Sequence, residues 1–393
     1  MQAEKDLKRK QLFIFGAYGC GNKGDDAILQ AISNHFSDCD LVATTGAYED
    51  IASVLPVKSV RCRLNEGFSI PLLFYMVCDS IRIFQKLAQS DALLFGGGSL
   101  IHDLSPYNLP FMFLWHRLAR ILRKRVYYVC IGIGPVQTHR GKKQCGKWLN
   151  LATGLFPRDL RGAEICRTVG ATRYLRVCDA ALTYTECFAE ADELLRQFCL
   201  KKGEYICVTA SNWLDNENYY KKDQNDKKAE DTIAGLAESL RALKRKLGYT
   251  YTLVFIPSEA RDVEIGSILR DKLAGEMICL PTSMDCAQVA GVVENSHIIV
   301  GMRMHPMIFA LRQGIPVIPI AYDKKIIELM KLFGLSDNVI LLEEICPENI
   351  LAMAERIERD RERIIAEIQN RANENRALGE ACFHIMRNEL GLE

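Results

Sequence analysis

Short apolar runs alternate with amphipathic segments along most of the chain. Residues 11–16 form an apolar run that ends in glycine, and apolar positions then recur at helical spacing from Asp25. Residues 91–100 and 125–135 are further apolar runs, with an amphipathic helix expected between them at 111–122. Strands that are apolar on both faces and separated by helices are typical of a parallel sheet with helices on both sides. The first half of the chain is therefore predicted to be an α/β domain.

The same rhythm returns in the second half. Its expected strands are 205–210, 251–257, 276–281, 296–301 and 316–322, and its expected helices are 231–247, 262–274, 285–295 and 306–313. We therefore predict two Rossmann-like domains, 1–200 and 201–393, that face a cleft. In the first domain, a helix around 163–170 and a strand that ends near Asp179 complete the pattern. A charged segment with helical periodicity, 347–388, is expected to form a C-terminal helix that could pack back across both domains.

The composition is that of an ordinary globular protein, and it restricts the ligands. The 393 residues include 50 Lys and Arg and 49 Asp and Glu, so the net charge of +1 offers no general attraction to nucleic acid. Any bound anion must be met by a local site. The 15 cysteines are odd in number and form no C-x-x-C pair, so we expect reduced core thiols and no metal site. No apolar stretch is long enough to cross a bilayer, and a cytoplasmic location is expected.

Two glycine-rich turns follow strands of the first half. Gly19–Gly24 has the spacing G-x-G-x-x-G of a dinucleotide site, but the next strand ends in threonine where a ribose-binding acid is expected. The alternatives are tight packing of strand against helix, for which glycine suffices, and a polar substrate held by Gly21, Asn22 and Asp25.

The second turn contains three successive glycines. Gly97 and Gly98, followed by Ser99, leave the backbone open to a ligand, and their amides can receive an anion or a sugar hydroxyl. The turn lacks the Lys and Ser/Thr spacing of a P-loop, which disfavours ATP. Asp103 follows closely and is a candidate base or hydroxyl acceptor, with a helix cap as the equal alternative.

The segment 300–306 combines a cation, a proton donor and the start of a helix. Arg303 and His305 are two residues apart and share a side if the segment is extended. A guanidinium matches a carboxylate or phosphate in two bonds, and histidine exchanges a proton near neutral pH. The structural alternative is a salt-bridged arginine and a satisfied histidine.

Further candidates lie on both halves of the chain. Arg158, with Arg161 near it, could add a second cation from the first half. Tyr322 and Lys324 close a predicted strand at the same expected sheet edge as Arg303. A surface turn is the simpler alternative for each of these sites.

Seven segments in one order resemble the polysaccharide pyruvyl transferase family: GAYGCGNKGDDAIL, LLFGGGSLIHD, IGIGP, RD, CDAALT, IIVGMRMHPMIFAL and IPVIPIAYDKK. The resemblance extends from about Phe13 to Lys325. It implies a GT-B-like fold and an enzyme that moves the pyruvyl group of phosphoenolpyruvate onto a sugar, usually as a cyclic ketal. By resemblance, Arg303 and His305 match the family's Arg-x-His, associated with the phosphoenolpyruvate site, and Arg158 matches its Arg-Asp motif.

The resemblance implies a ketal-forming pyruvyltransferase of polysaccharide biosynthesis that needs no cofactor and no metal. A general acid such as His305 would protonate phosphoenolpyruvate, and a carboxylate such as Asp103 would take the proton of the sugar hydroxyl. The first domain would bind the carbohydrate acceptor, which could be lipid-linked or nucleotide-linked and could bring the protein to the inner face of the membrane. The alternatives are a GT-B nucleotide-sugar glycosyltransferase and a non-catalytic glycan-binding protein. The chain departs from the family pattern at Cys130, Ile131 and Gly162.

Overall fold

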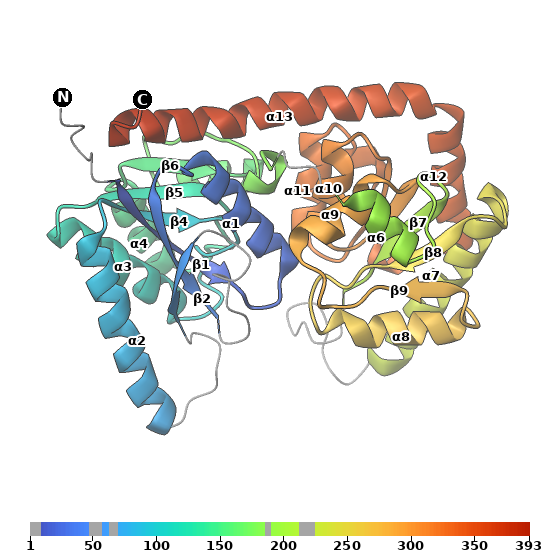
Figure 1. Ribbon diagram of the computed structural model, residues 1–393, viewed down its shortest axis with the longest axis horizontal. Helices are drawn as coiled ribbons and strands as arrows, with labels where there is room; N and C mark the ends of the chain where they lie inside the picture. Colours follow the sequence, from blue (N-terminus) through green and yellow to red (C-terminus); the bar gives the residue numbers. More distant parts are fainter. Residues whose placement is uncertain (1–8, 47–56, 63–69, 185–189, 212–224) are drawn as a thin grey trace, which may run out of the picture. The chain divides into compact units, whose positions relative to one another are not determined.

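The computed structural model describes residues 9–46, 57–62, 70–184, 190–211 and 225–393 (Figure 1). The chain forms two compact units: residues 1–184 with 377–393 make the first, and residues 185–376 make the second. Each unit contains one six-stranded sheet with helices, which confirms the predicted α/β class. The sequence predicts that acceptor specificity depends on two loops, 61–80 and 211–230, of which residues 63–69 and 212–224 lie outside the described residues.

The sheet of the first unit is parallel throughout and has the strand order β3-β2-β1-β4-β5-β6. Its strands are β1 (Gln11–Tyr18), β2 (Asp40–Thr45), β3 (Lys58–Arg61), β4 (Ala92–Gly96), β5 (Arg125–Ile131) and β6 (Gly154–Pro157). This is the Rossmann order, which reverses between β1 and β4. Ligands of such sheets bind beyond the strand ends at this reversal, and both glycine turns leave the sheet there.

Helices of the first unit pack on its buried strands. They are α1 (Lys23–His35), α2 (Ile70–Gln89), α3 (Asn108–Ile121), α4 (His139–Leu149), α5 (Leu160–Thr168) and the 3₁₀ helix η2 (Ala180–Leu182). Apolar side chains of α2, α3 and α4 share one core with Phe13, Phe95 and Tyr128 of the sheet, so these three helices cover the same face. The end of α13 (Arg361–Leu390) also joins this unit, where Phe383 stacks on His35 with ring centroids 3.9 Å apart.

The second unit repeats the same topology. Its parallel sheet has the order β12-β11-β10-β7-β8-β9, which reverses between β7 and β10. The strands are β7 (Tyr205–Thr209), β8 (Thr252–Phe255), β9 (Met277–Cys279), β10 (Ile298–Gly301), β11 (Val317–Ala321) and β12 (Ile340–Leu341). The helices are α6 (Ala191–Gln197), α7 (Asn225–Leu247), α8 (Asp262–Lys272), α9 (Cys286–Glu294), α10 (Met304–Arg312), α11 (Lys324–Leu332), α12 (Pro347–Arg359) and the short η5 (Ser336–Asn338) and η6 (Leu342–Glu344).

Several elements differ from the sequence-based expectations. Residues 172–179 form no strand, because this segment makes only isolated backbone bonds beside β6, such as Val177 N–H to Pro157 O. Residues 70–89 form α2, where part of a loop was expected. The segment 347–388 contains two helices rather than one, since α12 ends before Asp360 and α13 begins after it.

The limits of the two units also differ from residues 200 and 201. Helix α6 precedes residue 200 but packs against α9 of the second unit. Residues 377–393 belong to the first unit, so the two parts of α13 serve different units. The described cysteines are free thiols, as expected, and most of them are buried in the two cores.

Candidate functional site

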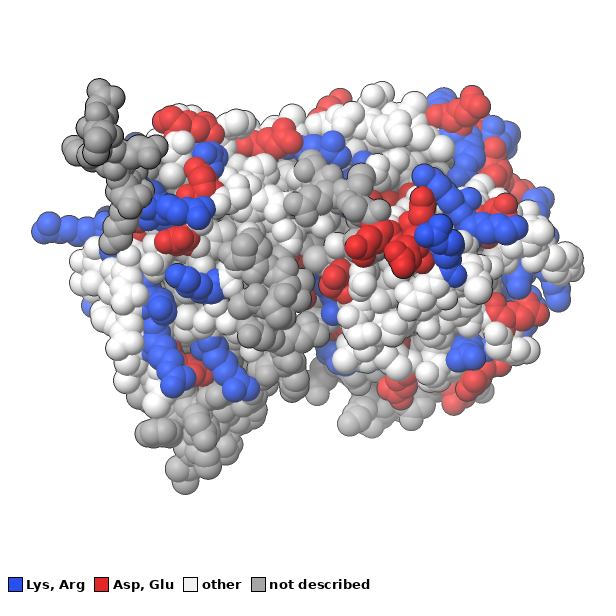
Figure 2. All heavy atoms as spheres, viewed as in Figure 1, with Lys and Arg blue, Asp and Glu red and all other residues white. Residues whose placement is uncertain are grey.

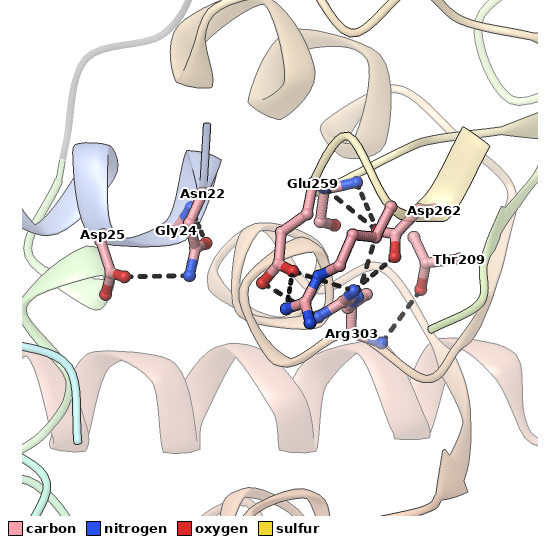
Figure 3. Close-up of polar contacts among 9 residues, drawn as sticks. Asn22, Gly24, Asp25, Thr209, Glu259, Asp262 and Arg303 are labelled. Atoms are coloured by element: carbon pink, nitrogen blue, oxygen red, sulfur yellow. Dashed lines mark hydrogen bonds and ion pairs between the residues drawn. The ribbon is translucent and has the colours of Figure 1, made fainter. Parts of the chain in front are cut away.

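The first glycine turn is closed by side chains of α1. Asn22 caps this helix, because its side-chain oxygen accepts the Gly24 N–H at 3.0 Å, and its Nδ2 donates to Asp25 Oδ2 at 2.9 Å (Figure 3). Asp26 accepts the Gly19 N–H at 2.9 Å. Two carboxylates thus stand at the start of α1, where a dinucleotide site would place its pyrophosphate. The turn fits a hydroxyl-rich ligand better than a phosphate, because like charges repel.

The triple-glycine turn lies directly against α1. Gly97 has φ +62°, and a Cβ at this residue would lie 2.2 Å from Cγ2 of Ile28. A Cβ at Gly98, which has φ +61°, would lie 3.2 Å from Asp25 Oδ1. Tyr18, at the end of β1, donates its hydroxyl to Gly96 O at 2.6 Å. The structure therefore brings the predicted residues of both glycine turns together at the reversal between β1 and β4.

Arg158 contacts the end of the triple-glycine turn at Ser99. Its Nη1 lies 2.7 Å from Asp179 Oδ2, with both side chains about 6% exposed, and its Nη2 donates to Ser99 Oγ at 3.3 Å. Burial acts to lower the pKa of Arg158, but Asp179 and Asp159 outweigh it and raise the pKa. Arg158 is thus a permanently charged group that is held by a buried carboxylate.

Asp103 anchors a loop of the first unit. Both of its oxygens accept the Gln137 N–H at 2.9 Å, and Oδ2 also accepts from the amide and hydroxyl of Thr138, the N-cap residue of α4. Burial acts to raise the pKa of Asp103, but these hydrogen bonds outweigh it and lower the pKa. A carboxylate with a lowered pKa is a weaker base, so these contacts favour a structural role over the proposed catalytic one.

In the second unit, Arg303 lies at the reversal between β7 and β10. It lies two residues after the end of β10 and is the N-cap residue of α10. Its backbone N–H donates to Thr209 Oγ1, at the end of β7, at 3.3 Å. His305 is half-buried in the first turn of α10. The expected extended conformation of 303–305 is therefore wrong, because the helix begins at Met304.

The guanidinium of Arg303 is enclosed by two carboxylates (Figure 3). Nε donates to Asp262 Oδ2 at 3.1 Å and Nη2 donates to Asp262 Oδ1, while Nη1 and Nη2 donate to Glu259 at 3.1 and 3.4 Å. Four N–H bonds thus use most of the five donors that arginine offers. Burial acts to lower the pKa of Arg303, but Asp262 and Glu259 outweigh it and raise the pKa.

The two carboxylates differ in how firmly they are fixed. The side chain of Asp262 is fully buried and also accepts the Ser258 and Glu259 N–H groups at 2.9 and 3.1 Å. The side chain of Glu259 is 18% exposed and binds the exposed Arg261 at 2.7 Å. Burial acts to raise the pKa of Glu259, but Arg303 and Arg261 outweigh it and lower the pKa. Glu259 is therefore an ionised group with a second cation within reach.

We call Arg303, Glu259 and Asp262 the Arg303 cluster, and residues after β11 border it. Tyr322 lies near enough to Arg303 to raise its pKa, and Lys325 near enough to Glu259 to lower its pKa. The Nζ atom of Lys325 lies 5.3 Å from the centroid of the Tyr322 ring. Lys324, the predicted residue, is exposed at the start of α11. The neighbouring lysine is thus the one that joins this site.

Sequence reasoning missed three residues that contact Arg303. Glu259 and Asp262 follow β8, and Thr209 ends β7. Their positions at the ends of predicted strands could have indicated them, because polar residues that follow adjacent parallel strands meet at one sheet edge. The strand order that places β8 beside β7 had to come from the structure.

Two Rossmann-like units in one chain define a GT-B-like fold, and solved structures share it. The putative UDP-N-acetylglucosamine 2-epimerase from Listeria monocytogenes has a TM-score of 0.65 at 11% identity, covering 98% of each chain. MnaA of S. aureus, solved with UDP, has a TM-score of 0.62 at 13% identity, also covering 98% of each chain. The UDP-GlcNAc 2-epimerase from Neisseria meningitidis has a TM-score of 0.61 at 13% identity, covering 98% of this chain and all of that chain. These likenesses confirm the predicted fold.

The family model of polysaccharide pyruvyl transferase matches residues 22–324. The match includes the triple-glycine turn, Arg158 and the Arg303 cluster. The chain therefore belongs to the polysaccharide pyruvyl transferase family. It is also similar to the amylovoran biosynthesis protein AmsJ of Erwinia amylovora, with 22% identity over 435 residues that cover 94% of this chain and 97% of that protein.

Proposed function

We propose that this protein transfers the pyruvyl group of phosphoenolpyruvate to two hydroxyls of a sugar as a cyclic ketal and releases phosphate. Membership of the family supports pyruvyl transfer in polysaccharide biosynthesis. The observation that carries the donor assignment is the Arg303 cluster, a fixed guanidinium beyond β10 whose second carboxylate partner is partly exposed. Phosphoenolpyruvate carries a carboxylate and a phosphate, and both match a guanidinium in two bonds.

Donor binding in this proposal requires Glu259 to leave Arg303. Asp262 stays in place, because it is buried and bound to two loop amides, and it keeps the guanidinium oriented. Glu259 turns to Arg261, which it already contacts, and an oxyanion of phosphoenolpyruvate takes its position on Arg303. The exchange replaces one anion by another, so the buried guanidinium is never left without a partner.

The acceptor is proposed to bind at the glycine turns of the first unit. Asn22 and Asp25 offer an amide and a carboxylate, and the turn 97–99 approaches them with two glycines that carry no side chain. Sugar hydroxyls both donate and accept hydrogen bonds and fit this mixture. Because Asp103 is occupied by loop amides, Asp25 is the better candidate to accept a proton from the attacking hydroxyl.

The chemistry begins with a proton delivered to the methylene carbon of phosphoenolpyruvate, a step assigned to His305. One sugar hydroxyl attacks C2, which has become electrophilic, and its proton passes to a carboxylate. The C2–O bond to phosphate breaks, and Arg303 stabilises the leaving phosphate. The second hydroxyl then attacks C2 and closes the ketal, and its proton returns to His305, while the proton on the carboxylate leaves with the phosphate. One phosphoenolpyruvate and one diol thus yield one ketal and one inorganic phosphate.

The test is incubation of the protein with phosphoenolpyruvate and a panel of lipid-linked, nucleotide-linked and free sugars. We expect equal amounts of released phosphate and of sugar that has gained a pyruvyl ketal, measured by mass spectrometry. Arg303→Ala and His305→Ala should lose transfer by about a hundredfold or more, whereas Arg359→Ala, at an exposed residue of the same unit, should retain it. Phosphate release without the sugar adduct, or turnover of a nucleotide sugar in its place, would contradict the proposal.

A further inference from the structure

Charge is divided unequally between the two units. By sequence, the first unit contains 25 Lys and Arg against 18 Asp and Glu, while the second contains 25 against 31. The excess of the first unit is concentrated in residues 101–149, which contain nine Lys and Arg and one acid, Asp103. The carboxylate of Asp103 is bound to loop amides. A chain of almost zero net charge thus has a local basic region, most of it on α3 and α4.

This basic region forms the outer side of one helical layer. Helices α2, α3 and α4 bury their inner sides in a common core on one face of the sheet. The exposed cations of α4 are Arg140, Lys142, Lys143 and Lys147, and α3 adds Arg117 and Arg120. Within the described ranges, no carboxylate forms an ion pair with any of these six side chains. Basic side chains also outnumber acidic ones around α2 in the lower left of Figure 2.

Large apolar side chains stand among these cations. Leu114 and Ile121 of α3 are 46% and 65% exposed, and Arg117 lies between them at helical spacing on the same side. Ile81 and Phe84 of α2 are 53% and 39% exposed. Scattered exposed apolar residues are ordinary, but here they gather on the layer that also holds the unpaired cations. We call the exposed sides of α2 (residues 78–89), α3 and α4 the basic helical face.

We propose that the basic helical face binds the surface of a membrane that contains anionic lipid. Lysine and arginine side chains would contact the phosphates of the headgroups, and Leu114 and Ile121 would enter the boundary between headgroups and acyl chains. A soluble polyanion would satisfy the cations but would leave the aliphatic side chains in water, so the combination favours a lipid surface. No helix in the described ranges is long and apolar enough to cross a bilayer, so the contact is peripheral.

The test is flotation of the full chain with vesicles of phosphatidylcholine alone and with about one third phosphatidylglycerol. Each basic residue near an anionic surface contributes about 1 kcal/mol, or about fivefold in binding, so Lys142→Glu, Lys143→Glu and Lys147→Glu together should lower partitioning about a hundredfold or more. The matched control is Lys201→Glu, Lys331→Glu and Arg359→Glu, which makes the same charge change at exposed positions of the second unit. It should bind like the wild type.

A second variant separates a lipid surface from a soluble polyanion. Leu114→Ser with Ile121→Ser keeps every charge, and we expect it to weaken vesicle binding several-fold while binding to polyphosphate stays unchanged. Glutamine replacements of the three lysines provide a milder variant, and circular dichroism checks the fold of each protein. Absence of wild-type flotation, full binding by the lysine variants, or insensitivity to the Leu114 and Ile121 changes would each overturn the proposal.

Discussion

The two units have the same strand order, yet each holds its buried arginine in a different way. In the first unit, Arg158 is paired with Asp179, and both side chains are about 6% exposed. In the second unit, Arg303 is paired with the buried Asp262 and with Glu259, which is partly exposed. Arg158 also has a second carboxylate nearby, since Asp159 Oδ2 lies 3.8 Å from its Nε, but Asp159 is held as the N-cap residue of α5, where Oδ1 accepts the Gly162 N–H. The comparison indicates that one arginine supports a turn and that the other is suited to receive an anion.

The helices that begin at the two strand-order reversals, α1 and α10, differ in the charge of their first turns. Helix α1 carries Asp25 and Asp26 in its first turn, whereas α10 has no acid in its first turn. Because a helix N-terminus is the positive end of the helix dipole, acids in α1 neutralise it and leave less attraction for a phosphate. This difference supports the proposed division into an acceptor side and a donor side.

Removal of Asp179 should have the largest effect on stability. Asp179→Ala leaves Arg158 buried without its carboxylate, which costs about 3–5 kcal/mol of the free energy of unfolding. Asp38→Ala is the matched control, because it breaks the more exposed pair with Arg387 in the same unit and should cost less than about 1 kcal/mol. Urea denaturation, with hydrogen exchange of β5 and β6, measures both. Equal losses for the two variants would show that Arg158 is not held by its buried partner.

The first unit should also lose stability in acid because of His116. This histidine is fully buried, its Nδ1 lies 2.9 Å from the Tyr128 hydroxyl, and burial lowers its pKa to about 4. Because the pKa of His116 is lower in the folded protein than in the unfolded chain, its neutral form stabilises the fold. This contribution is complete above about pH 6.5 and is lost as the pH falls towards 4. The expected loss is about 3 kcal/mol.

The free energy of unfolding between pH 4 and 6.5 tests this expectation. His116→Gln should flatten the dependence, although His35, whose burial lowers its pKa to about 4, will leave part of it. His139→Gln, at an exposed residue of α4 in the same unit, is the matched control variant. A pH profile that His116→Gln does not alter would show that this residue binds its proton equally well in both states.

Much of the fold could be predicted from the sequence, because buried parallel strands are apolar along their whole length. β1, β4, β7 and β11 were found in this way, as were the glycine turns and Arg303. The partners of the charged groups could not be predicted. The sequence shows an acid at Asp103 but not that the amides of 137–138 reach it, since that contact depends on the position of another loop. Pairing of Arg303 with Asp262 likewise depends on the neighbouring positions of β7, β8 and β10.

The glycine turns offer a smaller test within the first unit. Gly97→Ala should destabilise the protein by about 2–3 kcal/mol, because a positive φ is combined with a Cβ that would lie 2.2 Å from Ile28. Gly21→Ala also has a positive φ, +77°, but its Cβ would meet nothing within 4 Å, so only about 1–2 kcal/mol of backbone strain is expected. Thermal unfolding compares the two variants. A larger loss for Gly21→Ala would contradict the close approach of the triple-glycine turn to α1.

The prediction with the smallest expected effect tests the Arg303 cluster most directly. If Glu259 occupies the position of a substrate anion, Glu259→Gln should strengthen binding of phosphoenolpyruvate about tenfold, because the variant competes for Arg303 without a charge. Asp262→Asn should weaken binding, since Asp262 orients the guanidinium. Glu264→Gln makes the same change at an exposed residue of α8 and should have no effect.

Calorimetry with phosphoenolpyruvate and with inorganic phosphate separates this effect from catalysis. A displaceable Glu259 predicts tighter binding of both anions and a lower KM with little change in kcat, whereas a merely structural Glu259 predicts weaker binding and a less stable protein. Opposite signs for Glu259→Gln and Asp262→Asn would show that the two carboxylates have different tasks, as their burial suggests. The same sign for both variants would make the Arg303 cluster equivalent to the Arg158 pair and would remove the difference between the two units.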